Sequence, residues 1–535
     1  MKILKLNNVH ILAGILLLSI FSFSCKDEDR YDPDTSIISD KTLMELIKAN
    51  DQLSAFSSML EGTGYDKVLS GDQTYTVWAP NNEAISGLAF ETGEDSLKFI
   101  KNHTARFLQG ASGSFSKKVY MENMKLIPFG RTGLETYSFG GMELIDKNIS
   151  AANGILHTLG GSVPYTRNIW EKMEEPGFDS IRNYLYAQTT KRFSPSLSKE
   201  IGLDEGYPLY DSVFVETNPF WYEVASNINL LPSLRYLGGI YHVNQEDSLY
   251  TMILPTNEAW KEAYDRMFPH FANNAEDNPD SVQRYYTAFS IVQDLVFRGL
   301  VDGTENNLTS TRSTTFESPA GLFEGAIKED VSNGRIFKTD KLKYNSWESW
   351  NKPIKIEAEI PVYRNDPTTG LLGGRVHTDF NQYPGIEISN MYVYAATTAS
   401  TSPIYIDFYL PSVLAAEYDI YCVFIPDSLR FPLKPMPTKV RFSVQQLNRE
   451  TNRWQIIKSG GGTGSEITPS PNEVSATKVT KMLVAEKFKF PYMSINEEPF
   501  PLKIRVATTI TSPREINQFS NRMGIDYILL EPVKD

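Results

Sequence analysis

The stretch TYTVWAPNNEAI at residues 74–85 has a counterpart in LYTMILPTNEAW at residues 249–260. Tyr, Thr, Pro, Asn, Glu and Ala coincide between the two stretches at one constant offset. An Asn-Gly motif follows each copy, at Asn153 in ANGIL and at Asn333 in SNGRI. The interval from Asn82 to Asn153 is nearly the same as the interval from Asn257 to Asn333. Two motifs that repeat with similar spacing indicate a duplicated domain.

Each copy of the first motif predicts a strand followed by a short helix. Tyr75–Trp78 and Tyr250–Leu254 are rich in residues that favour β-structure, so we expect them to be buried strands. Pro80 and Pro255 are expected to end the strands, because proline cannot donate to a β-ladder. Each Asn-Gly motif is a turn signal between two further strands. The candidate caps of the short helices are Asn81 or Asn82 in the first copy and Thr256 or Asn257 in the second.

Longer helices are predicted around these motifs. Leu53, Phe56 and Leu60 share one helical face, with Gly62 and Gly64 as stop signals. A longer apolar stripe that Gly299 would close is expected to face a core. Its members are Val282, Tyr285, Phe289, Val292 and Val296.

These features together resemble a fasciclin domain. The resemblance rests on the strand-Pro-x-Asn-Glu-Ala motif, the helical segment that precedes it, and the Asn-Gly-Ile-Leu-His157 motif that follows. It implies an α/β wedge with a β-sandwich core and a role in adhesion or extracellular binding. The first repeat spans residues 41–165. The second repeat, residues 166–346, is more divergent, with extra sequence between about 190 and 245 and no counterpart of His103.

The last third of the chain, residues 347–535, is predicted to be an antiparallel β-sandwich of the jelly-roll type. Its signal is a series of short β-rich segments separated by turns. They are Ile354–Glu359, Ile404–Phe408, Tyr418–Ile425, Lys439–Ser443, Phe488–Pro491, Leu502–Val506 and Arg522–Pro532. The first and last of these resemble the terminal strands of carbohydrate-binding jelly rolls. The predicted fold class is therefore α+β, with two fasciclin-like α/β wedge domains before the sandwich.

Residues 1–24 have the parts of an export signal. Lys2 and Lys5 precede an apolar run from Ile11 to Phe23, which is too short to span a bilayer. Cys25 directly follows the small residue Ser24, which resembles the site where a bacterial lipoprotein is cleaved and joined to diacylglycerol. A plain signal peptide with an incidental cysteine is the alternative.

The residues after the cysteine predict where the anchored protein faces. Lys26, Asp27, Glu28 and Asp29 begin an acidic tether over residues 25–40. They resemble the signal that places lipoproteins of the Bacteroidetes on the outer face of the outer membrane. A solvated acidic run is the alternative interpretation.

Composition limits the partners and the chemistry. Cleavage before Cys25 would leave residues 25–535, with ample apolar content for packed cores. The net charge of −13 and the lack of a basic block argue against nucleic acid as a partner. Cys422 is the one cysteine left after lipidation and is expected to be a buried apolar residue, so no disulfide forms within the mature chain.

No catalytic residue, metal ligand set or cofactor motif is found in the sequence. The chain lacks His-Glu-x-x-His and Gly-x-Ser-x-Gly motifs, and the glycine loop at 460–464 lacks the Lys-Ser/Thr of a phosphate-binding loop. His103 and His157 are expected to be core residues. Trp347 and Trp350 lie near the boundary before the sandwich, where they would join two domains or, as the alternative, stack on sugar rings.

The sequence therefore favours a non-catalytic surface lipoprotein. The leading hypothesis is an accessory subunit that helps a TonB-dependent transporter of the starch-utilisation type, together with its lid lipoprotein, to capture glycan or peptide. The first alternative is an adhesin that acts through the two repeats. The second is a glycosidase hidden in the sandwich, because sequence cannot show whether two carboxylates face each other.

Overall fold

The computed structural model describes residues 39–194, 199–204, 207–211, 214–221, 243–275, 278–365, 371–376, 386–389, 391–397, 402–495 and 500–534. The chain forms two compact units, one ending at Tyr165 and the other beginning at Thr166. Both contain helices and sheets, and the C-terminal part is built from antiparallel sheets, which confirms the predicted α+β fold class.

Within the described ranges, no helix combines the length and the apolar character needed to cross a membrane.

The first unit is built around strand β1 (Tyr75–Pro80), the predicted strand of the first motif. One sheet has the order β2-β1-β8-β7, in which β1 runs parallel to β8 and antiparallel to β2; a second, antiparallel sheet has the order β3-β4-β5-β6. The strands are β2 (Thr104–Arg106), β3 (Ser116–Tyr120), β4 (Leu126–Arg131), β5 (Tyr137–Phe139), β6 (Met142–Glu143), β7 (Ile149–Ala151) and β8 (Gly154–Leu159). The helices are α2 (Leu43–Lys48), α3 (Ser54–Thr63), α4 (Asp66–Leu69), α5 (Asn82–Ile85) and α6 (Gly93–Asn102).

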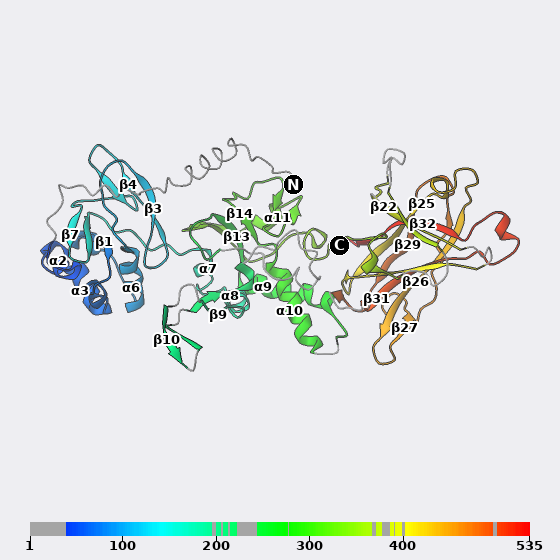
Figure 1. Cartoon of the computed structure of the whole chain (residues 1–535), viewed down its shortest axis with the longest axis horizontal. Coiled ribbons are helices and arrows are strands. Elements are labelled where there is room, and N and C mark those ends of the chain that lie inside the picture. Colours follow the sequence, from blue (N-terminus) through cyan, green and yellow to red (C-terminus); the bar gives the residue numbers. More distant parts are fainter. Residues whose placement is uncertain are drawn as a thin grey trace, which may run out of the picture. The chain divides into compact units, whose positions relative to one another are not determined.

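The two faces of β1 explain the layers of this unit. Val77 and its neighbours on the same face pack against α2, α3 and α6, and Trp78 packs on the opposite face against the β3–β6 sheet. Figure 1 shows the helices on one side of β1 and strands β3 and β4 on the other. The Trp78 ring is fully buried and is stacked 4.3 Å from Phe139 and 5.6 Å from His157 between ring centroids. The central strand therefore separates two apolar layers.

The asparagines of the first motif have separate structural roles. Asn81 caps α5, since its side chain accepts a hydrogen bond from the Ala84 amide at 2.8 Å. Asn82 instead accepts from the Ala55 amide at 2.9 Å and donates to the Asp51 carbonyl at 2.8 Å, which fixes the start of α3. In the second repeat, Thr256 is the cap of α9 (Asn257–Met267).

The asparagine of each Asn-Gly motif joins segments far apart in sequence. Asn153 accepts from the Leu43 amide at 2.8 Å and donates to the carbonyls of Leu69 and Gly71. Asn333 makes the equivalent contacts with the Ile169 amide and with two carbonyls, those of Val243 and Gln245. Both asparagines are buried, so the repeated motif is explained by folding and not by ligand binding.

The second unit begins with a sheet of the same topology. Its order is β14-β13-β18-β17, and β13 runs parallel to β18 with Tyr250 opposite Gly334, as Tyr75 is opposite Gly154 in the first unit. The strands are β13 (Tyr250–Pro255), β14 (Val296–Arg298), β17 (Ile327–Val331) and β18 (Gly334–Thr339). The helices are α7 (Ile169–Lys172), α8 (Asp179–Tyr186), α9, η5 (Phe268–Phe271), α10 (Pro279–Val292) and α11 (Ala320–Phe323).

Short strands account for the described part of the extra sequence after residue 190. Two antiparallel pairs form there, β9 with β12 and β10 with β11. Their bounds are Thr190–Phe193, Lys199–Asp204, Tyr207–Asp211 and Phe214–Thr217.

Two helix predictions were wrong in detail. Gly62 lies inside α3, and only Gly64 ends the helix, as a left-handed C-cap with φ of 73°. The apolar stripe predicted to run to Val296 ends with α10 at Val292. Val296 belongs to β14, because this β-branched residue pairs with Met252 of the neighbouring strand.

The C-terminal region is a sandwich of two antiparallel sheets. One has the order β21-β22-β32-β25-β29 with β19 also paired to β32, and the other has the order β20-β23-β31-β26-β27 with β28 on β26. The strands are β19 (Ile354–Glu357), β20 (Arg364–Asn365), β21 (Leu371–Val376), β22 (Met391–Ala396), β23 (Tyr405–Tyr409), β25 (Glu417–Ile425), β26 (Thr438–Asn448), β27 (Arg453–Ile456), β28 (Glu473–Val474), β29 (Thr480–Lys489), β31 (Leu502–Thr508) and β32 (Arg522–Pro532). The first predicted segment thus pairs with the last.

Candidate ligand-binding site

The predicted lipidation site, Cys25, and the predicted export signal, Lys26, Asp27, Glu28 and Asp29, lie outside the described residues. They remain predictions from the sequence.

The two histidines of the first repeat are core residues. His103 Nδ1 lies 2.9 Å from the Phe99 carbonyl, and its Nε2 accepts a hydrogen bond from the Val163 amide at 3.1 Å. His157 Nε2 lies 2.9 Å from the Gln109 carbonyl, and its Nδ1 accepts from the Asn148 amide. Burial lowers the pKa of both rings to about 4. Each ring is therefore neutral and bonded through both nitrogens, which leaves none of them for a metal or a proton transfer.

Cys422 is buried in the sandwich core, as predicted for a small apolar residue. Burial also raises the pKa of its thiol well above the usual value. A thiol in this state is a poor nucleophile.

The tryptophans at the boundary before the sandwich lie on a well-anchored connecting segment. Trp350 packs against two rings of η5, 5.1 Å from His270 and 6.2 Å from Phe271 between centroids. The buried carboxylate of Asp294, two residues after the end of α10, accepts hydrogen bonds from Ser349 Oγ at 2.6 Å and from Ser310 Oγ at 2.8 Å. The ring contacts place Trp350 against the second repeat, and its expected role in joining this repeat to the sandwich stays a prediction.

The sandwich is bonded to the second repeat across the same segment. The Ala415 amide donates to the His270 carbonyl at 2.9 Å, and the Met493 amide donates to the Ala272 carbonyl at 2.7 Å. Tyr418 is fully buried and donates through Oη to Asn351 Oδ1 at 2.7 Å. These bonds fix the geometry of the walls on both sides of the junction.

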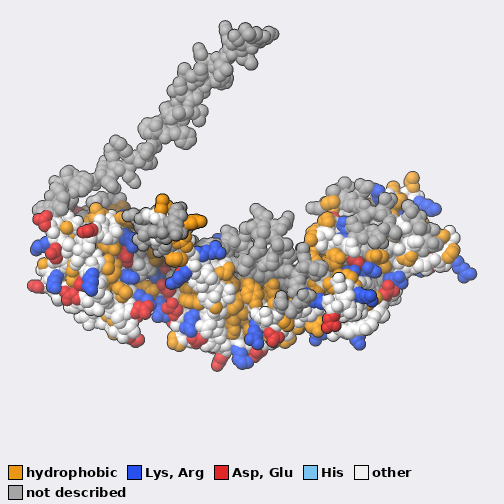
Figure 2. All heavy atoms as spheres, turned by 60° about the horizontal axis from the view of Figure 1, so that its bottom comes forward, with side chains coloured by type: hydrophobic (Ala, Val, Ile, Leu, Met, Phe, Trp, Pro, Cys, Tyr) orange, Lys and Arg blue, Asp and Glu red, His pale blue; other side chains and the backbone are white. Residues whose placement is uncertain are grey.

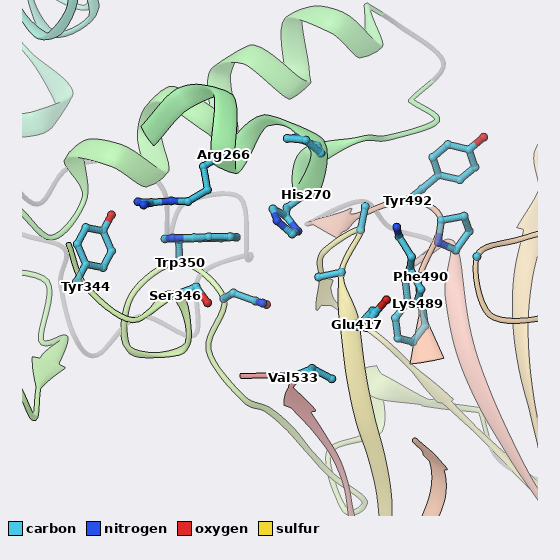
Figure 3. Close-up of a pocket in the computed structure, with 16 residues that line it drawn as sticks. Arg266, His270, Tyr344, Ser346, Trp350, Glu417, Lys489, Phe490, Tyr492 and Val533 are labelled. Atoms are coloured by element: carbon cyan, nitrogen blue, oxygen red, sulfur yellow. The ribbon is translucent and has the colours of Figure 1, made fainter. Parts of the chain in front are cut away.

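A cavity of about 670 Å³ lies at this junction. In Figure 3, Arg266, Tyr344 and Trp350 approach it from the second repeat and the connecting segment, and Lys489 lies on the side of the sandwich, where the Tyr492 ring is directed away from the cavity. The remaining described lining residues are Pro269, His270, Ser346, Asn351, Ala415, Ala416, Glu417, Gly460, Phe490, Pro491 and Val533. Aromatic faces and charged groups thus surround one volume that is large enough for a small ligand segment.

The charged groups at this junction cavity suit binding better than catalysis. The guanidinium of Arg266 donates to the Leu342 carbonyl at 3.3 Å, and Lys489 on the opposite wall is exposed. Among the described residues that line the cavity, Glu417 alone carries a carboxyl group. Glycoside hydrolysis of the usual kind needs two carboxyl groups across the scissile bond, so this lining does not provide it.

A second cavity, of about 860 Å³, lies beside Trp347. Lys534 Nζ lies 5.2 Å from the centroid of this ring. Three of its four carboxylates have structural partners: Glu348 accepts from the Glu317 amide, Asp419 accepts from the Lys487 amide, and Glu531 pairs with Lys481. The two tryptophans therefore face different cavities and do not form one platform.

The described residues contain no group of three or more His, Cys, Asp and Glu side chains placed to hold a metal ion. On the face shown in Figure 2, basic and acidic side chains are interspersed and form no broad area of one sign.

The sequence did not predict most of the cavity lining. Arg266, Tyr344, Lys489 and Tyr492 come from well-separated segments of the chain and carry no motif. Only Trp350 was a candidate, because a half-exposed tryptophan at a domain boundary is a known site for ligand stacking.

Comparison with known proteins identifies one domain. The fasciclin-domain family model matches residues 51–161. No curated protein matches the chain. Among solved structures, a FAS1 domain pair from the insect cell adhesion molecule fasciclin I is 12% identical with a TM-score of 0.20, and the match covers 56% of this chain and 98% of that one.

Other solved structures resemble smaller parts of the chain. The CBM22-1–GH10 modules of xylanase 10B from Clostridium thermocellum are 13% identical with a TM-score of 0.21, over 36% of this chain and 29% of that one. A CBM32 module of GH89 from Clostridium perfringens is 10% identical with a TM-score of 0.14, over 30% of this chain and 94% of that one. At these values the likenesses identify no ligand.

Proposed function

With a fasciclin domain at residues 51–161 as the premise, we propose that this protein is a non-catalytic binding lipoprotein of the cell surface. The observation that carries the proposal is the junction cavity, in which Trp350, Tyr344 and the charged groups of Arg266 and Lys489 surround one volume. Fasciclin domains occur in adhesion and binding proteins, which agrees with a binding role.

A glycan is the ligand that this lining favours over a peptide. Flat aromatic faces match the C–H faces of pyranose rings, and fixed charged groups beside them donate to or accept from sugar hydroxyls. The cavity is bordered by both cations and one carboxylate, Glu417, so it offers donors as well as an acceptor.

The membrane anchor is the second part of the proposal. Cys25 would carry the lipid, and Lys26–Asp29 would direct the protein to the outer face of the outer membrane. Cys25→Ser should move the protein from the membrane fraction to the soluble fraction, measured by immunoblotting after cell fractionation. A Cys25→Ser variant that stays with the membrane would contradict the lipid anchor.

The third part is the setting in which the ligand is captured. We propose that the protein assists a TonB-dependent transporter and its lid lipoprotein in taking up glycan. The test is gentle detergent extraction of the tagged protein from its native membrane, followed by mass spectrometry. Stoichiometric recovery of a transporter and a lid lipoprotein is the expected result, and recovery of the protein alone would overturn this part.

Adhesion is the second candidate function, and the fasciclin domain itself favours it. An adhesin would lose cell attachment when residues 41–346 are deleted and would keep it when the sandwich is removed. Attachment that is indifferent to both deletions would exclude this candidate.

A further inference from the structure

The loop between β25 and β26, residues 426–437, exposes apolar side chains. Leu433 is 100% exposed and Leu429 is 41% exposed. Proline flanks Leu433 closely on both sides, at Pro432 and Pro435. We call residues 426–437 the proline loop.

Both ends of the proline loop are held by one buried carboxylate. Asp427 Oδ2 accepts from the Met436 amide at 2.8 Å and from the Arg522 guanidinium at 2.5 Å, and its Oδ1 accepts from Tyr394 Oη at 3.2 Å. The Asp427 carbonyl also accepts from the amides of two loop residues, Arg430 and Phe431.

Aromatic packing under the proline loop adds a second restraint. The Arg522 guanidinium lies 4.0 Å from the centroid of the Phe431 ring, and that ring lies 5.7 Å from Tyr394. Phe431 therefore packs onto the sandwich, while Leu433, two residues later, points away from every surface of the protein. The loop is a rigid support for an exposed leucine.

Burial of a carboxylate is costly unless it is fully bonded, so the hydrogen bonds of the buried Asp427 restrict the shape of the loop. The prolines restrict the backbone before any contact forms, which lowers the entropy lost on binding. Covering such an exposed leucine with another apolar surface removes it from water, which lowers the free energy of the complex.

The charge of the proline loop indicates the chemistry of that surface. Arg430 and Lys434 are exposed, and residues 428–437 contain no acidic side chain. The whole chain carries a net charge of −13, so a loop whose exposed charged side chains are all cationic is a local exception. Complementary charge favours a partner with carboxylates around its apolar site.

We propose that the proline loop docks into a partner protein, with Leu433 in an apolar pocket and with Arg430 and Lys434 against carboxylates at its rim. This surface is separate from the junction cavity, so docking and ligand binding are independent properties.

The test is site-specific photo-cross-linking in intact cells with a photoreactive residue at position 433 of the full-length protein. The matched control places the same residue at position 134, where Leu134 is 88% exposed on the first unit. We expect position 433 to cross-link one protein, at a peptide that contains both apolar and acidic residues, and position 134 not to do so.

Charge reversal then tests the contact itself. Arg430→Glu with Lys434→Glu should reduce the cross-link at least tenfold, and replacement of the acidic residues in the cross-linked peptide by Lys should restore it. Failure of this rescue, a cross-link to lipid or a cross-link to a second copy of this chain would each overturn the proposal. Glycan binding by the charge-reversal variant should equal that of the wild type, which separates this test from that of the proposed function.

Discussion

Two core positions of the repeats show that histidine is not required by the fold. The His103 carbonyl accepts a hydrogen bond from the Trp78 amide, and the Leu295 carbonyl accepts the equivalent bond from Ile253 in the second repeat. His157 lies opposite Trp78 on the neighbouring strand, where the second repeat has Phe337 opposite Ile253. The same sheet is thus built once with two titratable rings and once with two apolar side chains.

This difference predicts an acid sensitivity of the first unit that is caused by these two histidines. The unfolded chain takes up protons at these histidines below pH 6.5, whereas burial holds the folded pKa at about 4. Stability should therefore fall as the pH drops from about 6.5 to about 4, by on the order of 3 kcal/mol for each histidine. Urea denaturation at a series of pH values, followed by Trp78 fluorescence, measures this slope.

The control replaces each histidine with the residue of the second repeat. His103→Leu and His157→Phe together should flatten the pH dependence of the first unit, whatever their effect on its stability at pH 7. An unchanged slope in the double variant would show that other groups cause the acid sensitivity.

Asp526 in β32 predicts the opposite pH dependence in the sandwich. Burial raises the pKa of its carboxyl to about 7, from an ordinary value of 3.8. The folded state binds a proton between about pH 4 and 7 that the unfolded state does not, so this contribution to stability is lost as the pH rises through that window.

Asp526→Asn removes the titration and keeps an oxygen that accepts from the Ser389 amide, the contact seen at 2.8 Å. The free energy of unfolding of the variant should exceed that of the wild type above pH 7 by on the order of 4 kcal/mol and should match it near pH 4. Guanidinium denaturation of both proteins at pH 4, 6 and 8 measures the difference. A variant that is less stable than the wild type at pH 8 would contradict the assignment.

At the scale of elements, local sequence signals predicted the structure correctly where the backbone geometry requires one residue type. The motif strands, their terminal prolines and the Asn-Gly turns follow from residues that few others could replace. Val296 shows the limit of periodicity: it continues the apolar spacing of α10, but pairing with Met252 places it in a strand. Contacts with a neighbouring strand decide such a case, and they lie outside any local window.

The two glycines Gly334 and Gly62 give a matched pair of element-scale variants. A Cβ atom at Gly334 would lie 1.8 Å from the Tyr250 carbonyl oxygen, so Gly334→Ala must break the parallel pairing of β13 with β18. We expect a loss of more than about 3 kcal/mol. A Cβ atom at Gly62, inside α3, meets open space, so Gly62→Ala should be neutral or stabilising by up to about 1 kcal/mol.

Thermal unfolding of the two glycine variants measures both changes in the free energy of unfolding. A Gly334→Ala variant as stable as the wild type would refute the close approach of the two strands. A destabilised Gly62→Ala variant would instead refute the placement of Gly62 in an exposed helical turn.

At the scale of the whole molecule, the second unit joins parts that the sequence divides. One apolar cluster runs from the second repeat into the sandwich, and backbone hydrogen bonds cross the junction. The cavity lining comes from segments that are far apart in sequence, such as Arg266, Trp350 and Lys489. No pattern in a single sequence shows that such residues converge, so the predicted fold class was confirmed while the candidate site was almost entirely missed.

The shared cluster predicts cooperative unfolding of residues 166–535. Amides of β13 in the second repeat and of β32 in the sandwich should exchange with the same opening free energy in native-state hydrogen exchange. Tyr418→Phe, which removes the hydrogen bond to Asn351, should lower both values together by about 1 to 2 kcal/mol. Different opening free energies for β13 and β32 would show that the second repeat and the sandwich unfold independently.

The central claim is that the junction cavity binds a glycan, and calorimetric titration tests it most directly. The purified protein is titrated with neutral glycans, acidic glycans and peptides, alongside Lys489→Ala and Glu417→Ala variants of the cavity and a Lys487→Ala control on the same strand outside the lining. The account predicts glycan binding that each cavity variant weakens at least tenfold and that the control retains. Glycan binding that both cavity variants retain, or binding of peptides alone, would contradict it.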